Sequence, residues 1–135
     1  MALRVDTTSS TSAQLDKSNY SWNHTMGSGG GKLLVVCIGN GDTKQVVNSV
    51  TYNSIALTRL DSIENTGGQN VKAEIWYLTN PPTGTYSIAV TLAGTTTRAG
   101  GGAISFFDAD QGQPFNTYEK KFSSSGVPSL SVTTT

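Results

Sequence analysis

The stretch Lys32-Leu33-Leu34-Val35-Val36-Cys37-Ile38 is apolar after its first residue, and the glycine-rich segment Gly39-Asn40-Gly41-Asp42 closes it. Its length, its β-branched residues and its glycine-rich flanks predict a strand that is buried on both faces. We expect this strand to form the centre of an all-β protein. Cys37, the single cysteine, is then expected to be a small buried hydrophobic residue, and it has no partner for a disulfide within the chain.

The composition agrees with an all-β protein. The chain has 135 residues, which fits one domain with a substantial core. Serine and threonine make up about a quarter of it, and 15 residues are glycine, as is typical of strands and turns. Charged residues are 13%, and the formal net charge is zero. Because no basic patch is evident, we expect neither nucleic acid nor a membrane surface as a partner.

Alternating side chains predict further strands on both sides of the central one. In Tyr20–Met26, large residues alternate with polar ones, so Tyr20, Trp22, His24 and Met26 should share one packed face. In Thr85–Leu92, every second residue is apolar, which again predicts one face in the core and one in water.

Turn residues predict how these strands are connected. Val46–Tyr52 and Ala56–Ile63 are expected to form a hairpin around Asn53-Ser54, since asparagine tolerates the left-handed conformation of a tight turn. Val71–Leu78 and Thr85–Leu92 are expected to form a second hairpin. Pro81 and Pro82 lie between them and lack backbone donors, so strand pairing should stop there.

The two ends of the chain are expected to differ from its middle. Leu3–Asp6 could form a short strand, but residues 1–12 as a whole are polar and predict an extended arm, which leaves residues 13–135 as one sandwich domain. Ala103–Phe107 predicts a buried strand, Asp108–Asn116 a loop, and Pro128–Thr135 a strand-like tail. With no amphipathic helix in sight, the fold class is an antiparallel β-sandwich of jelly-roll type, completed by strand exchange with a neighbouring subunit if the tail is shared.

Five blocks of sequence together resemble a known family of modules. They are Lys32–Val36, Val50–Thr58, Ile75–Gly84, Ala103–Phe106 and Asp110–Pro114, and the segment from Trp76 to Pro82 is the most specific. The blocks are similar to jelly-roll-like β-sandwich modules of bacterial extracellular proteins, which also occur as small structural proteins of tailed phages. The resemblance implies no catalytic residues. Members usually continue with further strands past the position of Val132, so the resemblance also implies an open sheet edge that could recruit another chain.

The residues that could support catalysis are few. His24 is the single histidine, and its phase with Tyr20 and Trp22 predicts a packed side chain rather than a catalytic base. Met26–Leu33 superficially resembles a phosphate-binding loop. It lacks the first glycine and the serine or threonine after the lysine, and it leads into a strand where a helix would be needed. We therefore expect no catalytic residue.

The acidic residues do not complete a known metal site or catalytic site. Asp108 and Asp110 belong to a fragment of a calcium loop, but the spacing and the distal glutamate of a complete loop are missing. Asp61 and Glu64 could act as a glycosidase pair only if the fold placed them on opposite sides of a sugar. The expectation is therefore no metal and no cofactor.

Aromatic residues are the remaining candidates for binding. Sugar-binding faces use exposed rings, and the chain offers Tyr20, Trp22, Trp76, Tyr77 and Tyr86, most of which we expect in the core. Trp76 alternates in phase with Lys72 and Glu74, which makes it the best candidate for an aromatic at the surface or in an interface.

Together these features predict a non-enzymatic structural protein of a virion, either a capsid decoration (cement) protein or a subunit of a head or tail appendage. It would bind neighbouring virion subunits and copies of itself, a trimer being expected, through residues near its termini and sheet edges: Leu3, Val5, Trp76, Leu130 and Val132. The alternative is a carbohydrate-binding or adhesive module that recognises a surface glycan; a glycan hydrolase is the least favoured. Because no signal-peptide pattern is seen, we expect assembly into virions in the host cytoplasm, with an extracellular or cell-surface location as the alternative.

Overall fold

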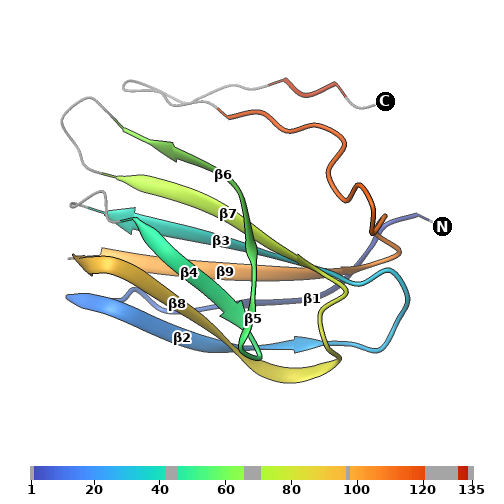
Figure 1. The fold of residues 1–135 in the computed structure, drawn as a ribbon, viewed down its shortest axis with the longest axis horizontal. Coiled ribbons are helices and arrows are strands. Elements are labelled where there is room, and N and C mark those ends of the chain that lie inside the picture. Colours follow the sequence, from blue (N-terminus) through green and yellow to red (C-terminus); the bar gives the residue numbers. More distant parts are fainter. Residues whose placement is uncertain (1, 42–45, 66–70, 97, 121–130, 134–135) are drawn as a thin grey trace.

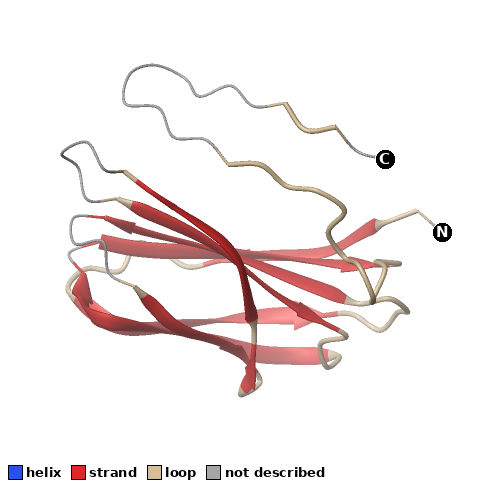
Figure 2. Ribbon diagram, turned by 45° about the horizontal axis from the view of Figure 1, so that its top comes forward, coloured by secondary structure: helices blue, strands red, loops and turns tan. Residues whose placement is uncertain are grey.

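The computed structural model describes residues 2–41, 46–65, 71–96, 98–120 and 131–133. Within these ranges the protein is all-β and has no helix: nine strands form two antiparallel sheets that pack face to face (Figures 1 and 2). The predicted antiparallel β-sandwich is therefore confirmed.

The two sheets contain five and four strands. In order across the sheet, the five-stranded sheet contains β1 (Arg4–Ser10), β9 (Arg98–Phe107), β3 (Leu33–Gly41), β7 (Lys72–Thr79) and β6 (Thr58–Glu64). The four-stranded sheet contains β2 (Lys17–Met26), β8 (Gly84–Thr96), β4 (Val47–Tyr52) and β5 (Ile55–Ala56). Strand β3 is the middle strand of the larger sheet, as its sequence predicts.

The expectation that β3 is buried on both faces is wrong. Leu34, Val36 and Ile38 are at most 1% exposed and point into the sandwich. Cys37 lies on the opposite face and is exposed, so it is not the buried residue that its apolar neighbours suggested. The outer face of β3 is apolar but only partly covered.

The predicted alternation of β2 and β8 is confirmed. Tyr20, Trp22, His24 and Met26 are buried, and the residues between them are exposed. Strand β8 contributes Ile88, Val90 and Leu92 to the same core. Side chains of both sheets thus interdigitate in one interior, as in other sandwiches.

The first predicted hairpin is only partly correct. Asn53 and Ser54 have φ angles of 49° and 64°, and they form the expected tight turn between β4 and β5. The return strand stops pairing with β4 after Ala56. At Leu57, which is buried, the chain passes to the other sheet and continues there as β6.

The second predicted hairpin is wrong, because β7 and β8 lie in different sheets. Asn80 has a φ of 49°, Pro81 is fully buried, and the chain crosses at this point from the larger sheet to the smaller one. Each strand sends every second side chain into the same interior from opposite sides, for example Trp76 from β7 and Val90 from β8. Alternation alone cannot distinguish this crossing from a hairpin.

Residues 4–10, predicted as part of an extended arm, instead form the edge strand β1. It pairs antiparallel with β9, with Val5 opposite Phe106 and Ser9 opposite Ala103. The polar composition of residues 1–12 suggested an arm detached from the core. Strand β1 is instead held by polar contacts, which are described below, and not by apolar burial.

At the other end, Asp108–Asn116 is a loop, as predicted, and residues 117–120 have no regular structure. Residues 131–133 of the predicted strand-like tail are not in a strand, and residues 128–130 lie outside the described part of the chain.

Candidate interaction surface

The outer face of the five-stranded sheet carries apolar side chains on every strand, with polar residues such as Thr8, Thr58 and Asp61 along its two edge strands. Cross-strand register places Phe106 opposite Leu33, Ile104 opposite Val35, and Cys37 opposite Ile75. We call this surface the outer apolar face, and it consists of Val5, Leu33, Val35, Cys37, Ile63, Ala73, Ile75, Tyr77, Ile104 and Phe106.

The outer face of the four-stranded sheet is polar by contrast. Its outward residues are Asn19, Ser21, Asn23 and Thr25 of β2, Thr85, Ser87, Ala89 and Thr91 of β8, and Ser49 and Thr51 of β4. This is the pattern expected of a sheet with one face in the core and one in water. The larger sheet does not follow that pattern, and its second apolar face therefore needs an explanation.

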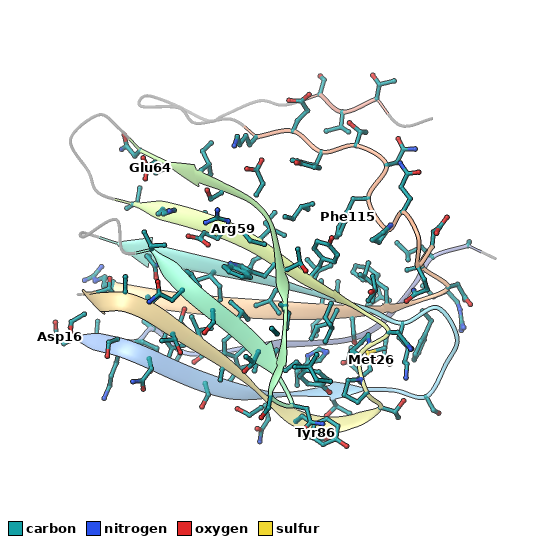
Figure 3. The ribbon with its side chains drawn as sticks, in the orientation of Figure 1. Asp16, Met26, Arg59, Glu64, Tyr86 and Phe115 are labelled. Carbon is teal, nitrogen blue, oxygen red and sulfur yellow. The ribbon has the colours of Figure 1, made fainter. Side chains whose placement is uncertain are left out.

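Part of the outer apolar face is covered by the segment that follows β9. Phe115 packs edge-on against Tyr77, with ring centroids 4.9 Å apart, and Figure 3 shows Phe115 between this segment and the sheet. The Lys120 ammonium lies 2.7 Å from an Asp61 carboxylate oxygen and 3.1 Å from the Ser62 carbonyl oxygen. The hydrogen bond from Lys120 lowers the pKa of the Asp61 carboxyl group.

The cover is incomplete. A hollow of about 110 Å³ remains between residues 118–120 and the outer faces of β6 and β7. Ile75, which lines this hollow, is 38% exposed, and Cys37 opposite it is exposed as well. Desolvation by its surroundings raises the pKa of the Cys37 thiol, as expected for a cysteine among apolar side chains. At the edge of the sheet, Val5 is 60% exposed.

The residues predicted to bind partners are not brought together in one place. Leu3 and Val5, at 56% and 60% exposure, lie at the β1 edge of the larger sheet. Val132 is 46% exposed in the C-terminal segment, and Leu130 lies outside the described residues.

Trp76 is not at the surface, and this expectation is corrected. It is 7% exposed and belongs to the core, and its indole N–H donates to the Glu74 carboxylate at 3.0 Å. Lys72 and Glu74 do share its face, as predicted, but that face points inward. The two charged residues can face the interior because they form an ion pair with each other.

This buried charge cluster is the most unusual polar feature of the interior. Glu74 has a fully buried side chain, and one carboxylate oxygen lies 3.3 Å from the ammonium of Lys72, whose side chain is 10% exposed. The same oxygen accepts a long hydrogen bond of 3.5 Å from the backbone N–H of Val47, and the other oxygen accepts the one from Trp76. Every partner is a donor, so the carboxylate is held as a structural anion.

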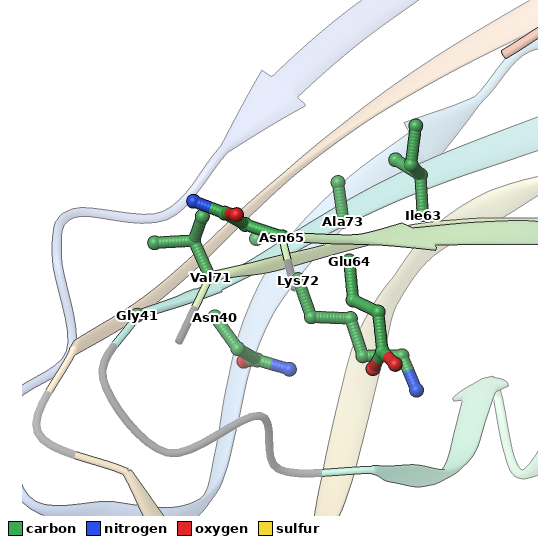
Figure 4. Close-up of a pocket in the computed structure, with 9 residues that line it drawn as sticks. Asn40, Gly41, Ile63, Glu64, Asn65, Val71, Lys72 and Ala73 are labelled. Carbon is green, nitrogen blue, oxygen red and sulfur yellow. The ribbon is translucent and has the colours of Figure 1, made fainter. Parts of the chain in front are cut away.

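Above this cluster, a pocket of about 370 Å³ opens at the end of the larger sheet. It is lined by Gly39, Asn40, Gly41, Ile63, Glu64, Asn65, Val71, Lys72 and Ala73. Figure 4 shows Glu64 and Lys72 extending to one side of the sheet, and Ile63, Val71 and Ala73 to the other. One acid and one base of opposite charge favour neither anions nor cations, so this lining points to no particular ligand.

The other candidate residues take structural roles. Asp108 pairs with the Arg4 guanidinium at 2.8 Å, and Asp110 accepts hydrogen bonds from the N–H groups of Gly112 and Gln113, as in a turn. His24 is 1% exposed and packed, as its phase predicts.

Within the described ranges, no group of three or more metal-binding side chains gathers to hold an ion. The same ranges contain no helix that is long and apolar enough to cross a membrane. Comparisons with models of protein families, with characterised proteins and with solved structures found no match to this chain.

Sequence reasoning missed the outer apolar face as a surface, although its signal was present. The apolar run of β3 was interpreted as burial on both sides. The sequence does show apolar residues for both faces, but it does not show how much covers the second one.

Proposed function

We propose that this protein is a non-enzymatic structural subunit of a virion, a capsid decoration protein or a head or tail appendage subunit. The observation that carries the proposal is the outer apolar face, which remains partly exposed while the equivalent face of the other sheet is polar. Partly exposed apolar surface of this kind is typical of surfaces that bind other proteins. The resemblance to small phage structural modules supports the virion setting.

The occupant of this face is a second copy of the same chain. The face is nearly free of charge, with Asp61 at its border already paired, so two copies can face each other without like-charge repulsion. Closed symmetric assemblies of one chain are common, and a trimer would suit a three-fold position on a capsid. Val5, as part of this face, contacts the second copy, and other virion proteins bind through the exposed residues Leu3 and Val132.

The carbohydrate-binding alternative receives less support. Of its five candidate rings, Tyr20, Trp22 and Trp76 are at most 9% exposed. Tyr77 packs on Phe115, and Tyr86 packs edge-on against Tyr52. These five residues do not offer the row of exposed rings that stacking on sugars requires.

The test compares one apolar and one polar outer face. Ile75→Asp places a charge on the outer apolar face, and Ser21→Asp places the same charge on the polar face of the other sheet. Sedimentation velocity should show self-association for the unmodified protein and for Ser21→Asp, and a monomer for Ile75→Asp. Near-UV circular dichroism checks that both variants remain folded.

The virion setting needs a separate measurement. Particles purified on a density gradient from a culture that produces the protein should contain it in a fixed ratio to the main shell protein, as mass spectrometry can measure. A folded monomer that is absent from such particles would refute the proposal.

A further inference from the structure

Strand β1 is attached to the sandwich by polar contacts on its inner side. Asp6, Thr7 and Ser9 face inward, whereas Val5 points outward and is 60% exposed. The Asp6 carboxylate accepts hydrogen bonds at 2.8 Å from the Gly27 N–H and from the Ser105 hydroxyl. The strand therefore places no large apolar side chain in the core, and hydrogen bonds with modest net energies hold it there.

The central contact of β1 is with the buried His24 on the facing sheet. Ser9 Oγ lies 2.8 Å from His24 Nδ1, and Thr7 Oγ1 lies 3.4 Å from His24 Nε2. The Thr7 hydroxyl sets the direction of these bonds, because it donates its proton to the Thr25 carbonyl oxygen. Trp22 Nε1 can only donate, and it donates to one lone pair of Ser9 Oγ at 3.0 Å, which leaves the Ser9 proton available to His24.

These directions assign the state of the imidazole. Thr7 Oγ1 has used its proton, so it accepts one from His24 Nε2. The remaining nitrogen, Nδ1, is then the acceptor for the Ser9 hydroxyl proton in a neutral ring. If Nδ1 also carried a proton, that proton would face the hydroxyl proton of Ser9. The Ser9 O–H bond would then have to rotate away from the imidazole.

The charges around His24 do not supply a direct partner for an imidazolium. Burial lowers the pKa of His24 below its ordinary value of 6.5, and the Asp6 carboxylate of β1 acts in the opposite direction. The bonds of Asp6 go to Gly27 and Ser105 rather than to His24. From the other elements, β4 presents Tyr52, β8 presents Tyr86 directly opposite, and β9 presents the uncharged Ser105.

We propose that β1 is an acid-released edge strand: protonation of His24 takes away the acceptor of the Ser9 hydroxyl proton and places an imidazolium without a direct anionic partner beneath β1, and the released strand uncovers the edge of β9. Water reaches the imidazolium only when β1 leaves, so the proton stabilises the released state. The uncovered β9 edge offers unpaired N–H and C=O groups beside Phe106 and Ile104, and a β1 strand from a second copy is its natural partner.

The direction of the pH effect follows from linkage. Because the pKa of His24 is lower with β1 attached, the released state binds the proton more tightly. Attachment is strongest above the ordinary pKa of 6.5 and weakens as the pH falls through it toward the lower value of the attached state. One proton changes the ratio of released to attached strand by up to about tenfold per pH unit in this window.

Hydrogen–deuterium exchange with mass spectrometry tests the proposal on the whole chain, from about pH 8 to about pH 5 across the histidine range, with rates corrected for intrinsic exchange. Peptides from residues 4–10 should lose protection below pH 6.5, whereas peptides from β3 should not change. In His24→Gln, which does not titrate, exchange in residues 4–10 should be independent of pH. Protection of β1 that is constant over this range in the unmodified protein would overturn the proposal.

Two further measurements distinguish His24 from other groups. In Asp6→Asn, the carboxylate that raises the pKa of His24 in the attached strand is gone, so the pKa difference between the attached and released states widens and acid release should be more complete. If release is abolished there but persists in His24→Gln, Asp6 is the group that titrates and the proposal fails. If His24→Gln does not fold, nitrogen NMR of the unmodified protein decides: Nδ1 should be unprotonated at neutral pH and should titrate together with the loss of β1 protection.

Discussion

Replacing Lys72 with methionine should destabilise the protein far more than removing any lysine at its surface. The substitution keeps the length and most of the apolar stem of the side chain but removes the ammonium group that lies 3.3 Å from Glu74. Glu74 cannot turn toward water, because its side chain is fully buried between the sheets. The carboxylate would keep its hydrogen bonds from Trp76 and Val47 but lose its counter-charge.

Leaving one charge of a buried pair without its partner costs about 3–5 kcal/mol. A domain of this size has a total free energy of unfolding of about 5–15 kcal/mol, so the loss is a large fraction of it. With a urea m-value of about 2 kcal/mol per molar, the unfolding midpoint should fall by about 2 M. Fluorescence of the two core tryptophans, Trp22 and Trp76, reports the transition.

Two controls show whether burial is the cause. Lys120→Met removes a lysine that is closer to its carboxylate, at 2.7 Å, but 54% exposed, and its midpoint should stay near that of the unmodified protein. In Lys72→Met/Glu74→Gln both charges are gone while an amide oxygen can still accept the Trp76 N–H, and most of the lost stability should return. A small shift for Lys72→Met, or a double variant no more stable than the single one, would contradict the reasoning.

Three further changes test the packing. The control for each is a substitution at a neighbouring residue of the same strand or the behaviour of an unmodified part of the protein. Gly101→Ala would place its Cβ 2.7 Å from the Trp22 ring and should cost about 1–3 kcal/mol in urea unfolding, whereas Gly100→Ala, with nothing within 4 Å of its Cβ, should be tolerated. Val36→Asp should prevent folding, as seen in the circular dichroism spectrum, because the side chain is 0% exposed; Cys37→Asp, on the outer face, should still fold. Deleting the chain up to the end of β1 should lower the thermal midpoint by several degrees and leave the other strands protected from exchange, and an unchanged midpoint would show that the polar contacts of β1 contribute nothing.

The sequence predicted strands well wherever local alternation alone determines the outcome. In β2 and β8 the apolar face could be assigned residue by residue, because one face meets the core and the other meets water. The turn at Asn53 could be predicted as well, since it depends on two residues and their backbone preferences.

Pairing and burial of polar residues could not be predicted in the same way. Strand β8 shows the expected alternation and β7 turns the opposite face inward from the one expected, but nothing local states that the two belong to different sheets. Lys72 and Glu74 suggested a solvent-facing side for Trp76, and only the three-dimensional arrangement shows that they neutralise each other inside. The full length of strand β1, beyond the short strand considered for Leu3–Asp6, was missed for a similar reason: its inner residues, such as Ser9, contact polar groups from distant strands rather than apolar ones.

The pairing of the first strand with the last one affects how the protein can be made. Thr7 and Ser105 contact each other across 98 positions, so a ribosome must synthesise nearly the whole sandwich before β1 has a place to bind. Until then β1 is unpaired, and its hydroxyl-rich sequence gives it little tendency to aggregate with other nascent chains. Because its docking closes a loop of about a hundred residues between the first and last described strands, it should be among the last steps of folding.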